Sequence, residues 1–119
     1  MIKIIDIANF KDKRGNLSVI ENCPFKIERL YYIYNNTKGL SRGGHKHKKT
    51  FQALICLRGN FDLEFFVNGK KHNYFIDDPN KMYLVNPEHW HEMKNMSKNC
   101  FLLVLASEKF DVNDYIYEK

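Results

Sequence analysis

A series of short strand-type runs, each ended by turn residues, constrains the fold of this 119-residue chain more than any other feature. The runs recur at the spacing of about 8–12 residues that is typical of β-sandwiches and barrels. No run of helical periodicity reaches the roughly 12 residues expected of a helix. The predicted strands span residues 2–7, 17–21, 27–34, 51–57, 61–67, 71–76, 82–85 and 100–106. The tail, residues 108–119, is predicted to form a short helix or a final strand. The pattern predicts an all-β, antiparallel sandwich or barrel.

The stretch 42–59, RGGHKHKKTFQALICLRG, carries two histidines that are two residues apart. An extended strand would present His45 and His47 on the same face. Residues 48–50 are polar enough for a turn, and the apolar run that follows ends at a second turn signal. We therefore expect a hairpin whose first strand carries both imidazoles. Because imidazole titrates near neutral pH, such a pair suits proton transfer or metal binding.

Length and composition limit the class of protein. The chain is long enough for one domain with a core and too short for two, so we expect a single domain over residues 1–119. The formal net charge of +5 indicates either an anionic partner or a surface with excess lysine. Basic residues are scattered, apart from Lys46, Lys48 and Lys49, so nucleic acid is not an expected partner.

Cysteine usage and apolar runs indicate the compartment. The three cysteines show no CxxC spacing, and Cys56 and Cys100 lie in apolar runs, where they are expected to pack as small hydrophobes. The sequence has no secretory segment and no apolar run of about 18 residues. We expect a soluble cytoplasmic protein without a membrane partner.

Two partial motifs resemble those of the cupin superfamily. The first cupin motif is HxH followed by Glu and Gly, and the second contains Pro, His and Asn. The matching residues here are His45, His47, Gln52, Gly59, Pro87, His91 and Asn95. The glycine expected between Pro87 and His91 is absent. The resemblance implies a cupin jelly roll, a small double-sheet fold whose concave interior holds the site.

The main departure from the first motif is Gln52, which stands where a metal-binding cupin has a carboxylate ligand. A neutral amide lowers the charge of the site and binds divalent cations weakly. A zinc site made of His45, His47 and His91 stays open as an alternative, because three histidines suffice for zinc. A further alternative is that these rings pack in the core for shape alone, at the cost of leaving polar atoms unpaired. We predict no metal.

Segments spread over nearly the whole chain resemble the sugar 3,4-ketoisomerases, cupin enzymes that act on dTDP-4-keto-6-deoxyglucose. The segments that carry the resemblance are 13–17 (KRGNL), Glu21, 24–25 (PF), 29–32 (RLYY), 42–48 (RGGHKHK), 90–93 (WHEM) and 102–107 (LLVLAS). The family motif is RGxHAHK, so Lys46 replaces an alanine and points away from the histidines. The resemblance implies a homodimeric isomerase that needs neither metal nor cofactor. It also implies a role in making deoxyaminosugars for antibiotics and for surface glycans such as the O-antigen of lipopolysaccharide.

Moving a carbonyl from C4 to C3 of a sugar requires a base of near-neutral pKa and a proton shuttle. By resemblance, we expect His45 to transfer the carbon-bound proton and His47 to shuttle the proton between oxygens; the residues alone leave this order open. Tyr31 and Arg29 share a strand face and are expected to stabilise the developing oxyanion, with Tyr31 counted as catalytic.

The expected substrate-binding residues are Arg14, Arg29, Arg42, Gln52, Trp90 and His91. The planar guanidinium of Arg42 suits a diphosphate, although a solvated surface arginine is the alternative. In the family resembled, Arg and His at the positions of Arg14 and His91 accompany galacto-type enzymes, whereas Tyr and Arg there accompany gluco-type enzymes. We therefore expect dTDP-3-keto-6-deoxygalactose as the product, unless both residues are only structural.

The sequence leaves two other functions open. A nucleotide-sugar epimerase also abstracts a proton beside a ketone, but such enzymes pair one histidine with an aspartate and a tyrosine, which the HxH pair argues against. A cupin module that binds a nucleotide sugar without turnover is not excluded by any residue.

Overall fold

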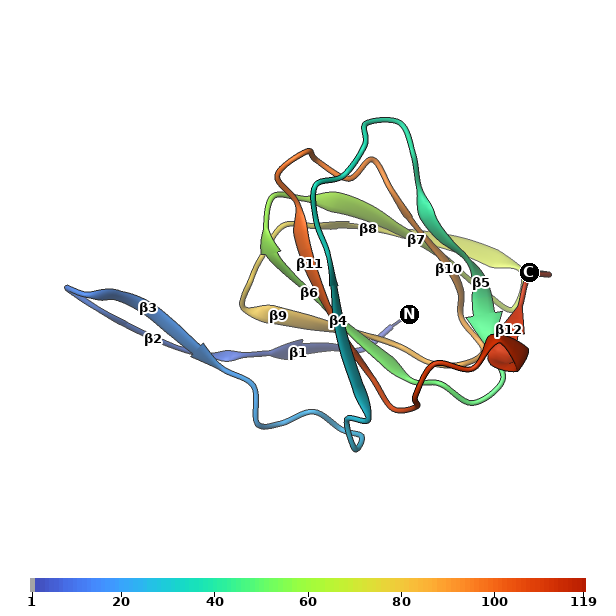
Figure 1. The fold of residues 1–119 in the computed structure, drawn as a ribbon, viewed down its shortest axis with the longest axis horizontal. Coiled ribbons are helices and arrows are strands. Elements are labelled where there is room, and N and C mark those ends of the chain that lie inside the picture. Colours follow the sequence, from blue (N-terminus) through green and yellow to red (C-terminus); the bar gives the residue numbers. More distant parts are fainter. Residues whose placement is uncertain (1) are drawn as a thin grey trace.

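The computed structural model describes residues 2–119, and its regular secondary structure is almost entirely antiparallel strand (Figure 1). Two five-stranded sheets form the body of the molecule. The first sheet has the strand order β1 (Ile4–Asp6), β9 (Lys81–Val85), β6 (Gln52–Arg58), β11 (Phe101–Ala106) and β4 (Arg29–Ile33). The second sheet has the order β12 (Tyr115–Ile116), β5 (Arg42–His47), β10 (Trp90–Lys94), β7 (Phe61–Val67) and β8 (Lys70–Ile76). This arrangement confirms the predicted all-β jelly roll. Within residues 2–119, no helix has the length and apolarity needed to cross a membrane.

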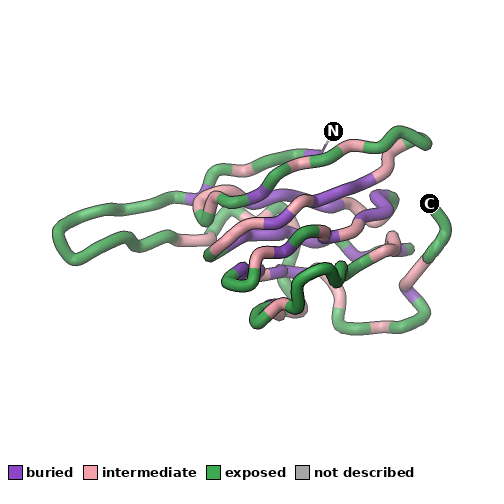
Figure 2. The backbone as a smooth tube through the Cα atoms, turned by 90° about the horizontal axis from the view of Figure 1, so that it is seen from above, coloured by how far each residue is buried: buried purple, intermediate pink, exposed green. Residues whose placement is uncertain are grey.

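A two-stranded hairpin, called the arm below, is separate from both sheets. It is formed by β2 (Ala8–Asp12) and β3 (Gly15–Val19), and it projects from the body beyond β1 (Figure 1). Its residues are almost all exposed, as the green hairpin in Figure 2 shows. The predicted strand over residues 2–7 is shorter in the structure, where it is β1, and the predicted strand over residues 17–21 begins two residues earlier as β3.

The main core lies between the two sheets. Strand alternation directs every second side chain inward, so Leu54 and Cys56 of β6 and Leu102 of β11 contact Phe61 and Phe65 of β7 in one buried cluster. Cys56 and Cys100 are buried free thiols, as predicted.

The outer face of the first sheet is covered only in part. A second buried cluster, which includes Ile55 and Leu84, packs under Ile20 and Phe25 from the segment that follows the arm. Beyond this cover the face is open. We call the open part the aromatic face: it consists of Leu30, Tyr32 and Tyr34, which are 55%, 53% and 52% exposed, together with Phe101, whose ring stacks on those of Tyr32 and Tyr34.

The predicted hairpin over residues 42–57 is wrong. β5 pairs with β10 and β12 in the second sheet, whereas β6 pairs with β9 and β11 in the first sheet. The turn after His47 therefore crosses between the sheets. The first five residues of β6 are all buried, because neighbours cover both faces of this central strand.

The remaining strands follow the sequence pattern closely. β7 has the predicted bounds, and β8 begins one residue earlier than predicted. The turn between them has Asn68 and Gly69 at φ 51° and 75°, as the Asn-Gly hairpin signal predicts. The tail was predicted to form a short helix or a final strand, and it contains both a 3-10 turn, η1 (Val112–Asp114), and the short strand β12.

Candidate active site

Three histidines meet on the inner face of the second sheet. His45 lies on β5 opposite His91 on β10, and His47 follows two residues later on the same face of β5. Their ring centroids are 4.9 to 6.1 Å apart. His47 and His91 are buried, and His45 is half-buried. The predicted convergence of the HxH pair is therefore correct, and a third imidazole joins it.

A glycine lets the two strands approach at this point. Gly43 has φ 91°, and a Cβ on it would lie 2.9 Å from the carbonyl oxygen of His91, so a larger residue would push β5 away from β10. The register between these strands shifts next to His91. The glycine-rich RGGH segment thus sets the separation of the histidines.

His45 and His91 line a cavity of about 290 Å³, called the histidine cavity below. Its other lining residues are Arg29, Tyr31, Ile33, Arg42, Gly43, Met93 and Tyr115. Five of the residues expected to act on the substrate therefore share one cavity, although they come from three different strands.

His47 forms an acid–base pair that the sequence did not reveal. Its Nδ1 donates to the carboxylate of Asp114 at 2.9 Å, and both side chains are at most 2% exposed. Asp114 also accepts the backbone N–H groups of Lys48 and Lys49 and the hydroxyl of Thr50. β12 pairs with β5 and carries the tail back over the histidines. Asp114 could not be identified from the sequence, because it meets His47 only through the long-range pairing of β12 with β5.

The environment keeps the histidines neutral. Burial lowers the pKa of His47, and the nearby charge of Arg29 lowers it further, although Asp114 opposes both effects. Burial and the neighbouring His47 lower the pKa of His45. Burial lowers the pKa of His91 to about 3. At neutral pH these rings are therefore bases with a free lone pair.

Asp114 keeps its charge despite being buried. Burial alone would raise its pKa, but the hydrogen bonds from Thr50, the Lys49 backbone and His47 lower the pKa below its ordinary value. An ionised carboxylate at Nδ1 fixes the tautomer of His47, so its Nε2 carries the lone pair.

Tyr31 is the phenol of the histidine cavity. Its hydroxyl accepts a hydrogen bond from Gln52 Nε2 at 3.0 Å, and Arg29 lies over its ring at 5.1 Å. Burial raises the pKa of Tyr31, while the charge of Arg29 acts in the opposite direction. The phenol is therefore protonated at neutral pH and can donate.

Unpaired polar atoms point to a polar ligand at this site. In the described part of the chain, the buried side-chain atoms without a hydrogen-bond partner are Arg29 Nε, His47 Nε2 and Gln52 Oε1. Buried polar groups are normally paired. All three belong to residues that were predicted to contact the substrate, and together they offer donors and acceptors.

The tail contributes an aromatic wall that sequence reasoning missed. The ring of Tyr115 stacks on His45 with centroids 4.4 Å apart, and Tyr117 lies edge-on to His45 at 6.3 Å. The aromatic residues of the tail were the only signal available, and they did not indicate which strand they would cover.

Four predicted site residues do not line the histidine cavity. His47 and Gln52 are buried and contact the lining residues His45 and Tyr31, whereas Trp90 and Arg14 lie elsewhere. Trp90 packs on Phe66 outside the cavity, donates Nε1–H to the Tyr117 carbonyl at 3.0 Å and contacts Lys119, so it anchors the tail rather than lining the cavity. Arg14 lies at the tip of the arm, where it pairs with Asp12 and its side chain is 85% exposed. The arm extends away from the side of the molecule that carries β5 and β12 (Figure 1), so Arg14 does not reach the histidines of its own chain.

The donor set does not fit the four-ligand metal site of cupins. Nitrogen atoms of the three histidines lie within 4.8 Å of one another, which would suit three imidazole ligands. The fourth position holds Gln52, a neutral amide whose nitrogen is bonded to Tyr31. The set therefore lacks the anionic ligand of that site.

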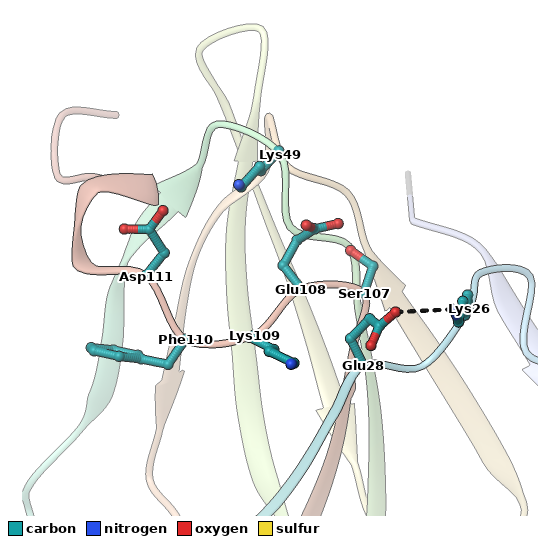
Figure 3. A pocket seen from close by; sticks show the side chains of 8 residues that line it. All are labelled: Lys26, Glu28, Lys49, Ser107, Glu108, Lys109, Phe110 and Asp111. Atoms are coloured by element: carbon teal, nitrogen blue, oxygen red, sulfur yellow. Dashed lines mark ion pairs between the residues drawn. The ribbon is translucent and has the colours of Figure 1, made fainter.

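A larger and more open groove of about 730 Å³ lies beside the site (Figure 3). Its walls mix both charge signs, including Lys49, Lys109 and the ion pair of Lys26 with Glu28 at 3.3 Å. Phe110 in this groove contacts Arg29 of the histidine cavity at 5.8 Å. None of the predicted site residues lines it.

Comparisons with known proteins agree in both sequence and structure. The family model described as FdtA: WxcM-like, C-terminal matches residues 1–119. A TDP-4-oxo-6-deoxy-alpha-D-glucose-3,4-oxoisomerase of Aneurinibacillus thermoaerophilus is 38% identical over 117 residues, which are 96% of this chain and 84% of that protein.

Solved structures give the same result. A histidine-to-asparagine variant of the 3,4-ketoisomerase QdtA from Thermoanaerobacterium thermosaccharolyticum, in complex with TDP-4-keto-6-deoxyglucose, matches with a TM-score of 0.94 and 37% identity over 98% of this chain and 87% of that chain. Two Campylobacter jejuni enzymes match over 98% of this chain. WlaRB, a TDP-quinovose 3,4-ketoisomerase, has a TM-score of 0.92, 34% identity and 92% of its own chain covered. WlaRA, a TDP-fucose-3,4-ketoisomerase, has a TM-score of 0.91, 29% identity and 89% covered.

Proposed function

We propose, from the premise that this chain belongs to the FdtA, WxcM-like C-terminal family, that it converts dTDP-4-keto-6-deoxyglucose into a 3-keto sugar. The chain is an isomerase, as its relatives are. One observation carries the proposal: the free Nε2 of a neutral, Asp114-oriented His47 lies in a cluster of three imidazoles, and the other two, His45 and His91, line the histidine cavity together with Tyr31. This arrangement suits repeated proton transfer at neutral pH.

The reaction moves two protons and leaves the composition of the sugar unchanged. A base removes the proton from C3, and the electron pair of that C–H bond forms a C3–C4 double bond while the C4 carbonyl oxygen takes up charge or a proton. The resulting enediol then receives a proton at C4 and loses the O3 proton. C3 is oxidised to the ketone and C4 is reduced to the alcohol, so no external oxidant or reductant is needed.

The pair of His47 with Asp114 favours the reverse of the assignment expected from the sequence, in which His45 transfers the carbon-bound proton and His47 is the shuttle. We assign the carbon proton transfer to His47, because Asp114 fixes its tautomer and stabilises the imidazolium that forms. His45 lines the cavity and would shuttle the proton between O3 and O4. Its ring, stacked on Tyr115, is held in place for this role.

The charge that develops on the C4 oxygen needs a fixed donor. Tyr31 and Arg29 face the histidine cavity and would supply it; in other enzymes one such donor is worth about 3 kcal/mol of barrier. Arg42 lies at the same cavity and would bind the diphosphate, for which its planar fork is suited.

The product at C4 is the finer part of the proposal. The relatives include both a quinovose-type and a fucose-type ketoisomerase, so similarity alone does not decide between the epimers. On the identities of Arg14 and His91, we infer the galacto epimer, dTDP-3-keto-6-deoxygalactose. A cytoplasmic homodimer that serves deoxyaminosugar and O-antigen synthesis, with no nucleic acid or membrane partner, completes the proposal.

The test is incubation with dTDP-4-keto-6-deoxyglucose in deuterated buffer that contains a strong chelator, because no step above uses a metal. The proposal predicts a 3-keto sugar with deuterium at C4, and NMR of the C4 centre reports the epimer. Retention of the 4-ketone with label at C5 would instead indicate the epimerase. Binding without any exchange would indicate the non-catalytic module.

A further inference from the structure

Gln52 and Tyr31 meet across an intervening strand. Gln52 lies on β6 and Tyr31 on β4, with β11 between them in the first sheet. Ala106 of β11 is in register with Gln52 and also with Arg29, and it is fully buried. Tyr31 is in register with Val104, so Gln52 and Tyr31 lie diagonally across β11. Because the β11 side chain directly next to Gln52 is only a methyl group, the Gln52 amide extends past it and reaches the Tyr31 hydroxyl at 3.0 Å.

The direction of this hydrogen bond determines where the phenol proton points. A phenol oxygen has one proton to donate and lone pairs that accept. Gln52 Nε2–H occupies a lone pair, so the proton of Tyr31 is left for another acceptor. Among residues 2–119 the Gln52 amide is the hydrogen-bond partner of this hydroxyl, and no protein acceptor takes its proton. The proton is therefore left free to point into the histidine cavity, which Tyr31 lines.

The carboxylate that the first cupin motif has at this position would reverse that direction. An ionised carboxylate can only accept, so a glutamate at position 52 would draw the phenol proton toward itself and away from the cavity. We propose that Gln52 is a positioning residue that turns the Tyr31 hydroxyl proton toward a sugar oxygen in the histidine cavity. The proposal rests on the ketoisomerase function and assigns to the amide a role beyond contact with the substrate.

The groups around Tyr31 are consistent with a neutral donor. Arg29 on the same strand and Arg42 on β5 are cations that cannot accept a proton. His45 on β5, His91 on β10 and Tyr115 on β12 face the same cavity. Burial raises the pKa of Tyr31, and the Gln52 hydrogen bond, which stabilises the phenolate, lowers it.

The hydrogen-bond direction can be measured without any turnover. Protein labelled with 3-fluorotyrosine is titrated by fluorine NMR, and the Tyr31→Phe variant identifies the resonance of residue 31. Gln52→Met removes the amide with little change in volume. Loss of a donor to the phenolate should raise the Tyr31 pKa. A lower Tyr31 pKa in Gln52→Met would mean that Gln52 accepts the phenol proton, and the proposal would be overturned.

Kinetics test the consequence for catalysis, with a chelator present throughout so that a new carboxylate cannot recruit a metal. Gln52→Glu should lower kcat about 10²-fold at neutral pH, as expected when one oxyanion donor is lost. Its kcat should recover as the pH falls, because a protonated carboxyl can again donate to Tyr31, whereas Gln52→Met should show no such recovery. In a Tyr31→Phe background, Gln52→Glu should have no further effect.

A Gln52→Glu variant with wild-type kcat, or one that is equally impaired with and without Tyr31, would contradict the positioning role. A wild-type protein without ketoisomerase activity would refute the proposed function instead, and the sign of the Tyr31 pKa shift would still decide the direction of the hydrogen bond.

Discussion

At the scale of single residues, the chemistry depends on Asp114, which lies 67 positions from its partner His47. Asp114→Asn should lower kcat by about 10²-fold or more, because an amide does not hold the imidazole in the required tautomer. Since the carboxylate raises the pKa of His47, its loss should also move the acid limb of the kcat/KM profile to lower pH.

Asp111→Asn is the matched control for this prediction. Asp111 caps the same 3-10 turn by accepting from the Asn113 backbone, and asparagine is an equally good cap. This variant should keep wild-type kcat and its pH profile. If Asp114→Asn resembled the control in both measurements, the acid–base pair would have no role in turnover.

The buried His91 predicts how stability depends on pH. Its pKa is about 3 in the folded protein, against an ordinary value of 6.5. As the pH falls through 6.5, the unfolded chain binds a proton that the folded chain does not, so the folded state loses stability. At pH 5 the loss from His91 alone is about 2 kcal/mol relative to pH 7.

Urea denaturation at the two pH values measures this loss. Because His45 and His47 also have lowered pKa values, the total loss should be larger than that of His91 alone. His91→Gln should make the dependence shallower. A wild-type denaturation midpoint that is unchanged between pH 7 and pH 5 would contradict neutral burial of the ring.

At the scale of elements, local pattern predicts strands well and their partners poorly. β7 and β8 follow from alternation and an Asn-Gly turn, which act over neighbouring residues. The crossing between β5 and β6 could not be predicted, because the residues after His47 fit a hairpin turn equally well. β10 was not assigned as a strand, since its sequence WHEMK mixes polar and aromatic residues.

Because local pattern does not show which strands pair, only part of the site could be predicted from the sequence. The shared face of His45 and His47 is a property of one strand, so spacing alone was sufficient. The contacts of Asp114 and Tyr115 depend on the pairing of β12 with β5, which only the complete fold provides. Alternation in β10 also explains the outward position of Trp90, because it precedes the inward-facing His91.

The arm is the element that bears on product stereochemistry. The double change Arg14→Tyr with His91→Arg should shift the product toward the gluco epimer at C4. A difference of about 1.4 kcal/mol between the two protonation faces is enough for tenfold selectivity, and one charged hydrogen bond can supply it. Product NMR measures the ratio, and an unchanged ratio would remove both residues from the control of C4. Because Arg14 lies far from the histidines of its own chain, it can influence the C4 epimer only if it reaches the histidine cavity of a second chain.

At the scale of the whole molecule, we expect a homodimer that uses the aromatic face. A monomer seldom exposes a contiguous patch of this kind without a partner, and the arm adds Phe10 and Leu17, which are 64% and 58% exposed. A second copy of this chain would cover the aromatic face and bring an arm within reach of a neighbouring site. Sedimentation should therefore give twice the 14.2 kDa of one chain.

Tyr32→Lys tests the interface and its link to the arm in one variant. A lysine placed in an apolar interface loses hydration without gaining a partner, so the dimer should dissociate, while the exposed position leaves the fold of each chain intact. Phe75→Lys is the matched control, because Phe75 is 59% exposed on β8 in the second sheet, against 53% for Tyr32. The control should remain dimeric.

The Tyr32 variant should sediment as a monomer and, without the Arg14 of a partner, should give a mixture of C4 epimers. Dissociation with unchanged stereochemistry would mean that Arg14 does not act in the cavity of a partner chain. A Tyr32→Lys protein that stays dimeric would mean that the dimer interface lies elsewhere.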